Sequence, residues 1–417
     1  MKIMGTEGNE NNVDLPALVG TAEDDRIHGH GGNDFLVGMG GDDRLFGGTG
    51  HDVLIGGGGV EDPGDDHMVG GEGNDLLRAG LGDDFVNGGG GIDRATFFVN
   101  PGLNPGITSG VTVSLMINGK AQDTGYGLKK LVGIEHLSGT AFTDHLTGDQ
   151  GDNWLFGGSG GDDSYFGLGG DDLITVAAGD EYVDGGSGND SVSLWGNGAV
   201  AGPVTVSLEL QDGWQATGAG SLYLTSIENL SGTESDDSLT GDRRGNVLAG
   251  WAGSDTLVGG RGNDTLLGDG EITMSGDEPA GGTIVILQKG SDDPAGDDVL
   301  TGGRGADALS GGAGADTFVY TGILDSRVGR PDRIRDFDGA EGDRIDLAAI
   351  DADRGSAGDQ AFSFIGTAGF SGAAGELRAE DADDGMHLFG DVNGDAIADF
   401  EILVRGDEPI VAADLVL

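Results

Sequence analysis

The sequence contains no cysteine, which excludes disulfide bonds and thiolate metal sites. Basic residues are few: 21 lysines and arginines stand against 73 aspartates and glutamates, for a net charge of −52. This charge makes nucleic acids and anionic membranes unfavourable partners and cations favourable ones. No apolar run approaches the ~20 residues that a membrane-spanning helix needs. The opening stretch, MKIMGTEGNENNVDLPALVG, lacks the apolar core of a secretory signal peptide, so we expect any export to use another route.

Large apolar residues are also scarce. Hydrophobic residues make up 36% of the chain, whereas 88 of the 417 residues are glycine and only 9 are proline. Low hydrophobicity combined with high net charge is typical of a disordered chain. One interpretation is therefore an acidic chain that is disordered without metal, and composition does not exclude it.

Glycine and aspartate recur with a period of nine residues. Rows such as GHGGNDFLV and GMGGDDRLF fill residues 20–96, with one interruption between residues 56 and 69. The sixth position of each row is an aspartate: Asp25, Asp34, Asp43, Asp52, Asp66, Asp75, Asp84 and Asp93. The eighth position is apolar: Ile27, Leu36, Leu45, Leu54, Met68, Leu77, Val86 and Ala95.

This spacing has a physical meaning. Positions seven to nine predict a short strand whose middle side chain points inward, because side chains alternate along a strand. Positions one to six predict a turn, where glycine reaches backbone angles that strain other residues. Such a turn can aim several carbonyl oxygens and one aspartate at a common point, and calcium prefers oxygen ligands of this kind. Two rows then form one coil of 18 residues with a strand on each side, and successive coils stack about 4.8 Å apart.

The apolar residue of each row supplies only a thin core, and the stacked carboxylates repel one another without a cation. We therefore expect metal binding to be coupled to folding. The rows match GGxGxDxUx, the calcium-binding repeat of the RTX (repeats-in-toxin) proteins, and the sequence resembles that family. The resemblance implies an all-β fold of stacked, calcium-binding parallel β-rolls, with several calcium ions as the bound cofactor.

Two further blocks, residues 139–193 and 232–319, contain rows such as GLGGDDLIT, GGSGNDSVS, GGRGNDTLL and GGAGADTFV. Their sixth positions add to the expected calcium ligands: Asp163, Asp172, Asp190, Asp255, Asp264, Asp298, Asp307 and Asp316. An insertion, residues 271–296, interrupts the third block. Its stretch GGTIVILQKG is expected to form a hairpin with EITM.

Some rows depart from the pattern. Asn153 and Asn246 stand at position six, and Phe142 and Ser235 replace the glycine of position four. Glu181 is a further departure. Because a neutral amide is a weaker calcium ligand than a carboxylate, we expect fewer ions than rows.

The segments between the blocks are duplicated. VTVSLMINGK begins at Val111 and VTVSLELQDG at Val204, an offset of 93 residues. Each segment is expected to form strands that cap or bridge the rolls. The predicted domains are an N-terminal cap (1–19), a first roll (20–96), a connecting β segment (97–138), a second roll (139–193), a second connecting β segment (194–231), a third roll (232–319) and a C-terminal β cap domain (320–417).

The region from about Asp316 to Leu417 resembles the C-terminal domain of serralysin-type secreted metalloproteases, through stretches such as DRIRDFDGAEGDRIDLAAID and the final DLVL. In that family the C-terminus is the signal for type I secretion. The resemblance therefore implies a secreted, extracellular or cell-surface protein with the type I secretion apparatus as a partner. A plain β cap on the last roll explains the same residues, since a solenoid needs such a cap.

Within that region, DVNGDAIAD offers a separate candidate calcium loop. Asp391, Asn393 and Asp395 alternate, and Asp399 follows four residues later. Alternate oxygens converge on calcium in the first half of an EF-hand loop. The distal glutamate of such a loop is absent, and a simple turn between strands is the alternative.

No catalytic motif accompanies the repeats. The seven histidines form no H-E-x-x-H zinc motif, and the sequence has no G-x-S-x-G elbow of a lipase. His28 and His30 lie two residues apart, but histidines of surface loops are more often plain surface residues than zinc ligands. We therefore expect that the protein is not an enzyme.

The function that we expect is that of a secreted calcium-binding repeat protein, which folds on calcium after export and serves as a structural, surface or matrix component. The alternative is a carbohydrate-binding, adhesin-like module. Phe35, Phe85 and Trp154 stand at the outward-facing position seven, and Trp214 and Trp251 lie in expected turns. These aromatic residues can stack on an extracellular polysaccharide, pack on a neighbouring roll or serve self-association.

Overall fold

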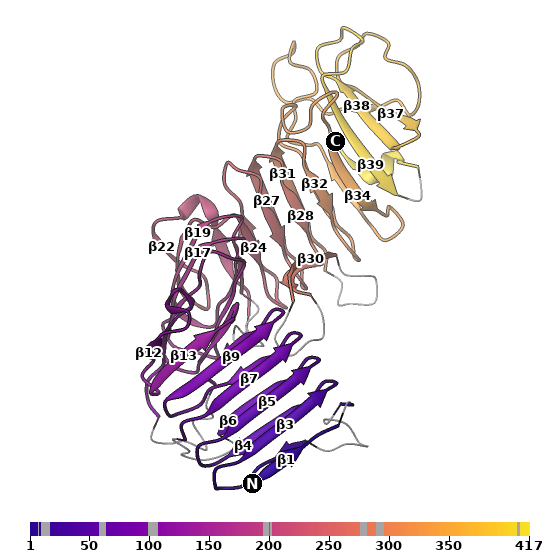
Figure 1. Ribbon diagram of the computed structural model, residues 1–417. Coiled ribbons are helices and arrows are strands. Elements are labelled where there is room, and N and C mark those ends of the chain that lie inside the picture. The colour runs from indigo at the N-terminus through magenta and orange to yellow at the C-terminus, as the bar shows by residue number, and fades with distance from the viewer. Residues whose placement is uncertain are drawn as a thin grey trace.

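The computed structural model describes residues 1–6, 8–9, 17–57, 64–98, 107–194, 200, 202–275, 282–288, 296–406 and 409–417. Apart from strands, its regular elements over these residues are three short 3-10 helices, η1 (Leu115–Ile117), η2 (Leu208–Leu210) and η3 (Ala412–Asp414). Within the described ranges, no helix has the length and apolar character needed to cross a bilayer. The strands stack into an elongated rod with the two termini toward opposite ends (Figure 1).

One sheet, here called the common sheet, runs through all three repeat blocks and into the C-terminal region. Its strands pair in parallel from β2 as far as β39, and β38 and β37 then join antiparallel. In ladder order the strands are β2 (Leu18–Val19), β4 (Phe35–Met39), β6 (Val53–Gly57), β8 (Leu76–Arg78), β10 (Arg94–Thr96), β14 (His136–Thr140), β16 (Trp154–Gly158), β18 (Leu173–Thr175), β20 (Ser191–Ser193), β24 (Asn229–Ser231), β26 (Val247–Ala249), β28 (Thr265–Leu267), β32 (Ala308–Ser310), β34 (Asp332–Phe337), β39 (Phe400–Gly406), β38 (Gly385–Asp391), β37 (Glu376–Ala382) and β36 (Ser363–Phe364).

Three shorter sheets face the common sheet one after another along the rod. The first facing sheet consists of β1 (Lys2–Met4), β3 (Arg26–Gly31), β5 (Arg44–Thr49), β7 (His67–Glu72), β9 (Asp84–Gly90), β13 (Leu128–Val132) and β12 (Ala121–Asp123). The second consists of β11 (Thr112–Ser114), β15 (His145–Thr147), β17 (Ser164–Gly169), β19 (Gly179–Ser187), β23 (Gly220–Thr225) and β22 (Trp214–Ala216). The third consists of β21 (Thr205–Ser207), β25 (Ser238–Thr240), β27 (Thr256–Arg261), β31 (Val299–Arg304), β33 (Thr317–Val319), β35 (Arg344–Asp346) and β40 (Leu415–Val416).

Neighbouring strands on each side of the rod are one coil apart. Ile27 in β3 is level with Leu45 in β5, and Leu36 in β4 is level with Leu54 in β6. Every position-eight residue of the first block, from Ile27 to Ala95, has an exposed fraction of 0%. The predicted all-β fold, its coils of two rows and the inward-facing apolar column are therefore confirmed.

The connecting β segments end one facing sheet and begin the next. β12 pairs antiparallel with β13 and completes the first facing sheet, whereas β11 starts the second by pairing with β15. β22, β23 and β21 repeat this arrangement one duplication later. The common sheet continues past both segments through the pairs β10–β14 and β20–β24. The segments thus bridge the rolls on one side of a ladder that is unbroken on the other.

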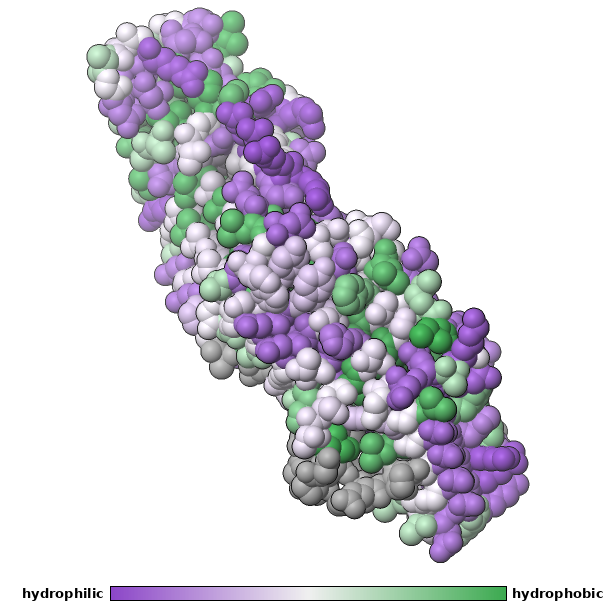
Figure 2. All heavy atoms as spheres, turned by 90° about the vertical axis from the view of Figure 1, so that its left-hand side faces the viewer, coloured by the Kyte–Doolittle hydropathy of each residue, from purple (hydrophilic) through white to green (hydrophobic). Residues whose placement is uncertain are grey.

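Two additions complete the rod. In the C-terminal region, β34 and β35 extend the two sheets in parallel, and β39 and β40 follow them. In the insertion, β29 (Gly270–Met274) and β30 (Ile284–Gln288) form the expected antiparallel hairpin. Its Ile272 packs with Leu173 and Leu267 in a second apolar cluster on the common sheet. Hydrophilic residues form bands along the rod between apolar patches (Figure 2).

Candidate calcium sites

The aspartates of position six are buried in the turns at the edges of the rod. Asp75 is typical, with an exposed fraction of 0%. Its Oδ1 accepts the main-chain N–H of Asp52, one coil earlier, at 2.7 Å. The N–H of Asp75 in turn donates to Asp93 Oδ1 at 2.8 Å. A ladder of such hydrogen bonds joins successive coils and holds one oxygen of each carboxylate.

The second oxygen, Oδ2, points at the first glycine of its own row. A Cβ placed on Gly70 would lie 2.1 Å from Asp75 Oδ2 and 2.6 Å from the carbonyl oxygen of Gly88, which leaves no room for a side chain. Glycine therefore keeps open a cradle in which carboxylate and carbonyl oxygens converge. The rows of Asp34, Asp43 and Asp52 repeat it, with Oδ2 atoms 2.2 Å from the Cβ positions of Gly29, Gly38 and Gly47 and a carbonyl oxygen beside each; in the row of Asp66, Oδ2 lies 2.1 Å from the Cβ position of Gly56.

Many of the buried Oδ2 atoms lack a hydrogen-bond donor. An unpartnered buried carboxylate oxygen is energetically costly, so each of these atoms marks a place that a cation would stabilise. Over the described part of the chain, the Oδ2 atoms without a donor belong to Asp75, Asp93, Asp172, Asp190, Asp255, Asp264, Asp298, Asp307, Asp316 and Asp332.

The donor set suits calcium. In the described ranges, no three carboxylate or histidine side chains gather at one point. A cation in these cradles would therefore take most of its ligands from main-chain carbonyl oxygens, with aspartate supplying the charge. Calcium accepts such all-oxygen sets of six to eight ligands. Zinc instead requires nitrogen, sulfur or carboxylate side chains in a tetrahedron.

Electrostatics favour the same conclusion. The pKa of Asp75 is raised to about 8, mainly by burial; the hydrogen bond from the Asp52 N–H lowers the pKa, and the carboxylates of Asp52 and Asp93 contribute to the rise. Burial likewise raises the pKa of Asp255 to about 9, with Asp298 and Asp237 adding to the shift. Stacked carboxylates thus disfavour their own ionisation until a cation compensates them.

Rows with threonine at position two satisfy their aspartate internally. Thr140 donates to Asp144 Oδ2 from its main-chain N–H at 2.6 Å and from its hydroxyl at 3.2 Å. Thr21 donates in the same way to Asp25 Oδ2, at 2.6 Å and 2.8 Å. The oxygen of Asp25 that would face a cation thus already accepts two hydrogen bonds, and Asp25 as a calcium ligand stays a prediction.

In three further rows, a neutral side chain donates a hydrogen bond to an oxygen of the turn: a tyrosine hydroxyl in one row and an asparagine amide in two. The hydroxyl of Tyr165 donates to Asp163 Oδ2 at 3.1 Å, so this oxygen has a donor within the protein, and Asp163 as a calcium ligand stays a prediction. Asn153 Nδ2 donates to the carbonyl oxygen of Glu135 at 2.8 Å, and Asn246 Nδ2 donates to that of Glu228 at 2.7 Å. The side-chain amide thus compensates a carbonyl oxygen with a proton, which explains why the asparagine rows tolerate the loss of a carboxylate.

Asp84, another predicted ligand, has an ion-pair partner in the protein. Its Oδ2 lies 2.5 Å from Lys129 Nζ, and this ammonium group also donates to the carbonyl oxygen of Gly82 at 2.6 Å. Lysine thus binds one carboxylate and a main-chain carbonyl of the turn, as a metal ion would. The counter-ion of Asp84 is therefore a side chain of the protein itself, supplied by the connecting β segment.

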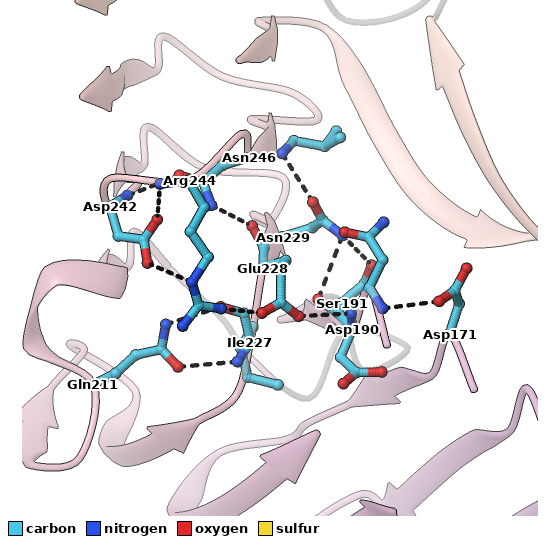
Figure 3. A network of polar contacts seen from close by, with 12 residues as sticks. Asp171, Asp190, Ser191, Gln211, Ile227, Glu228, Asn229, Asp242, Arg244 and Asn246 are labelled. Atoms are coloured by element: carbon cyan, nitrogen blue, oxygen red, sulfur yellow. Dashed lines mark hydrogen bonds and ion pairs between the residues drawn. The ribbon is translucent and has the colours of Figure 1, made fainter. Parts of the chain in front are cut away.

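The junction between the second and third rolls has a different cationic side chain, that of Arg244 (Figure 3). Glu228 Oε2 accepts the N–H of Asp190 at 3.0 Å, and Glu228 Oε1 forms an ion pair with Arg244. Arg244 Nε also lies 3.6 Å from Asp242 Oδ2. At the first junction, Glu135 Oε2 accepts the N–H of Asp93 at 2.8 Å, but the duplicated position of Arg244 is Gly151. The two junctions thus differ by one cationic side chain.

The loop from Asp391 to Asp399 brings its oxygens together but directs them to N–H groups. Asp391 Oδ1 accepts the N–H of Gly394 at 2.7 Å, and its Oδ2 accepts that of Ala396 at 2.9 Å. Asp399 Oδ2 accepts the N–H of Val392 at 2.8 Å, and Asp395 Oδ1 that of Ile397 at 2.9 Å. Asn393 Nδ2 donates to Asp399 Oδ1 at 3.0 Å. This is the geometry of a turn held by its own side chains, the alternative considered above.

The predicted outward aromatics differ from expectation. Trp154 is half-buried: its Nε1 donates to Thr175 Oγ1 at 2.9 Å, and the insertion hairpin packs with it. Trp251 is buried in its turn. Of the five aromatic residues singled out in the sequence, Trp214 is the exposed one, with an exposed fraction of 57%. It lies in β22 rather than in a turn.

Sequence reasoning missed a second ladder, at position five. Asp42 Oδ1 accepts the N–H of Asp65 at 3.0 Å, and Asp65 Oδ1 accepts that of Asp83 at 2.8 Å. The recurrence of aspartate and asparagine directly before position six was the available signal. Asp332 was also missed: its Oδ1 accepts the N–H of Asp307 at 2.9 Å, although the nine-residue rhythm has ended.

Comparison with known families decides the identity of this architecture. The family model for the peptidase M10 serralysin C terminal matches residues 8–417. The chain belongs to this family. The match covers the three repeat blocks as well as the C-terminal region. The RTX-type resemblance that the rows indicated is therefore confirmed.

Other comparisons add little to this family assignment. No curated protein matches this chain. Among solved structures, it is similar to the R3 subunit of the mannuronan C5-epimerase AlgE6 from Azotobacter vinelandii. The two share 29% sequence identity over 44% of this chain and 78% of that subunit, with a TM-score of 0.24.

Proposed function

We propose that this protein is a secreted structural or surface exoprotein that folds when calcium fills its glycine cradles after type I export. In this proposal it has no catalytic activity, consistent with the absence of a zinc-protease or lipase motif from the sequence. Low calcium inside the cell keeps the chain loose for export, and millimolar calcium outside drives folding.

The observation that carries the proposal is the column of buried Oδ2 atoms without donors. Asp255, Asp298 and Asp316 follow one another along one edge of the rod, each linked to the next through Oδ1. Their Oδ2 atoms all lack a donor. Without cations, the coils bring like charges together in a chain whose net charge is −52. Calcium removes this repulsion, so its binding energy becomes folding energy.

The test is a calcium titration of the chelated chain, followed by far-UV circular dichroism. A cooperative gain of β signal with calcium, and none with the same concentration of magnesium, is the expected result. Magnesium demands octahedral geometry and dehydrates reluctantly, so the carbonyl-rich cradles should not hold it. A chelated chain that is already β-rich and does not respond to calcium would contradict the proposal.

A second candidate function, carbohydrate binding, is favoured by one observation on the second facing sheet. Phe166, Tyr182, Tyr223 and Trp214 form a continuous aromatic ladder, with ring-centroid distances of 5.5, 5.0 and 5.6 Å between neighbours. Trp214 ends this ladder with an exposed fraction of 57%, so its ring is the one that a sugar can reach most easily. This aromatic ladder replaces Trp154 as the candidate platform.

Glycan-array binding by the calcium-loaded protein tests this candidate. Trp214→Ala and Tyr223→Ala should each abolish binding, because each removes a ring from the platform. Phe46→Ala, in the first facing sheet, is the matched control and should leave binding unchanged. Absence of array binding by the wild type, together with calcium-dependent self-association, would favour the structural role alone.

A further inference from the structure

Basic residues gather at one edge of the third roll, where the third facing sheet turns into the common sheet. Arg261 ends β27 and Arg304 ends β31, and the two residues are level on neighbouring strands. Arg243 lies one coil earlier, beside the main-chain hydrogen bond from Arg261 N–H to Asp242 O. Arg327 and Arg330 lie just before β34, the strand that pairs with β32. We call these five residues the arginine edge.

A tight turn places two of the arginines side by side. The N–H of Arg330 donates to the carbonyl oxygen of Arg327 at 3.0 Å, and the two residues form an antiparallel bridge. Residues opposed across such a bridge project to the same face. Gly329 at the tip has φ +79° and donates its N–H to Glu401 Oε2 at 2.6 Å. The main chain of the turn is thus fixed, which places the two arginines at neighbouring positions on one face.

The two arginines help to form a pocket of about 210 Å³. Its other lining residues are Asn263, Arg304 and Gly305, so the lining contains three arginines and no carboxylate. All five side chains of the arginine edge are exposed. Across the described residues, none of the five guanidinium groups has an ion pair or a side-chain hydrogen bond.

Position five carries no carboxylate where the arginines gather. Elsewhere, position five often carries an aspartate, as at Asp42, Asp65 and Asp83. In the turns of the arginine edge, position five is Gly245, Asn263 and Ala306. In a chain with 73 acidic and 21 basic residues, unneutralised arginines without neighbouring position-five carboxylates form a local reversal of charge. Such a surface fits an anionic ligand.

We propose that the arginine edge binds an acidic polysaccharide, with one carboxylate or sulfate group seated in the pocket of Arg304, Arg327 and Arg330. The planar guanidinium fork matches these oxyanions with paired, charge-assisted hydrogen bonds. Arg304 and Arg261 repeat the charge at about 4.8 Å, the spacing of neighbouring strands, so an extended chain can engage several coils. The pocket lining contains no aromatic side chain for stacking bases, which disfavours single-stranded nucleic acid.

The experiment measures binding of a fluorescent heparin fragment to the full, calcium-loaded chain. The triple variant Arg304→Gln/Arg327→Gln/Arg330→Gln should weaken binding about tenfold or more, because the pocket loses its charge-assisted contacts. The control Lys120→Gln/Arg354→Gln/Arg405→Gln removes the same charge from exposed positions elsewhere and should change affinity less than about twofold. Equal losses in the two variants would overturn the site.

Three further arms make the assignment specific. Neutral dextran should not bind, and a single-stranded oligonucleotide of equal charge should bind more weakly than heparin. Equal binding of that oligonucleotide would overturn the assignment to a polysaccharide. Arg261 lies outside the pocket, so Arg261→Gln should weaken the binding of a long heparin fragment but not that of a heparin disaccharide. Removing rings from the aromatic ladder should leave heparin binding intact, because the two surfaces belong to different facing sheets.

Discussion

The ammonium group of Lys129 lies 2.5 Å from Asp84 Oδ2, and both side chains are fully buried. Lys129 reaches this aspartate from β13, 45 residues further along the chain. The pair ties the connecting β segment to the last coil of the first roll. It also gives the last aspartate on this edge of the first roll a counter-ion from the protein itself. Asp93, on the other edge of the same coil, has no such partner for its Oδ2 among the described residues.

The first prediction concerns this pair. Lys129→Leu leaves Asp84 buried without its counter-ion and should destabilise the calcium-loaded protein by about 3–5 kcal/mol. Urea unfolding at saturating calcium measures the loss. The double variant Asp84→Asn/Lys129→Leu leaves no buried charge and should recover more than half of it. Equal stability of the single and double variants would show that the ion pair is not responsible.

The second prediction separates open aspartates from satisfied ones. Asp172 has an Oδ2 without a donor, whereas Asp144 Oδ2 accepts two hydrogen bonds from Thr140. Asp172→Asn should therefore lower the number of bound calcium ions, measured by isothermal titration calorimetry. Asp144→Asn is the matched control: it keeps an acceptor oxygen and should leave the stoichiometry unchanged. The same loss of ions in both variants would contradict this division.

The repeat period made the scaffold predictable, but not the occupancy of its turns. A nine-residue row fixes both the coil and its inward residue, so the burial of Leu45 and Leu54 followed from spacing alone. Whether an aspartate stays open depends on a donor nearby. Thr140 supplies one from within the row and could have been found by comparing position two across rows. Lys129 comes from 45 residues away, which no local pattern reveals.

The third prediction concerns pH in the absence of metal. Burial raises the folded-state pKa of Asp75 to about 8 and of Asp255 to about 9, from an ordinary value of 3.8. Between pH 3.8 and these raised values, the folded state binds more protons than the unfolded chain. The stability of the metal-free fold is therefore greatest at low pH and is lost as pH rises through the raised values. Circular dichroism in chelator should show more β structure at about pH 5 than at about pH 9.

Calcium should reverse this dependence. The ion requires ionised carboxylates, so the calcium concentration at half-folding should rise as the pH falls. Titrations at several pH values test both statements on the same protein. Identical spectra of the chelated chain across the range would argue against carboxylate repulsion as the reason that it stays unfolded.

The fourth prediction tests the glycine cradle itself. A Cβ on Gly70 would fall 2.1 Å from Asp75 Oδ2 and 2.6 Å from the carbonyl oxygen of Gly88, where the cation is expected. Gly70→Ala should therefore weaken calcium binding and shift the folding midpoint to higher calcium, by about tenfold if it costs about 1.4 kcal/mol. Gly322→Ala is the control, because its Cβ would meet no atom within 4 Å. If the two variants fold at the same calcium concentration, the space beside Gly70 is not where calcium binds.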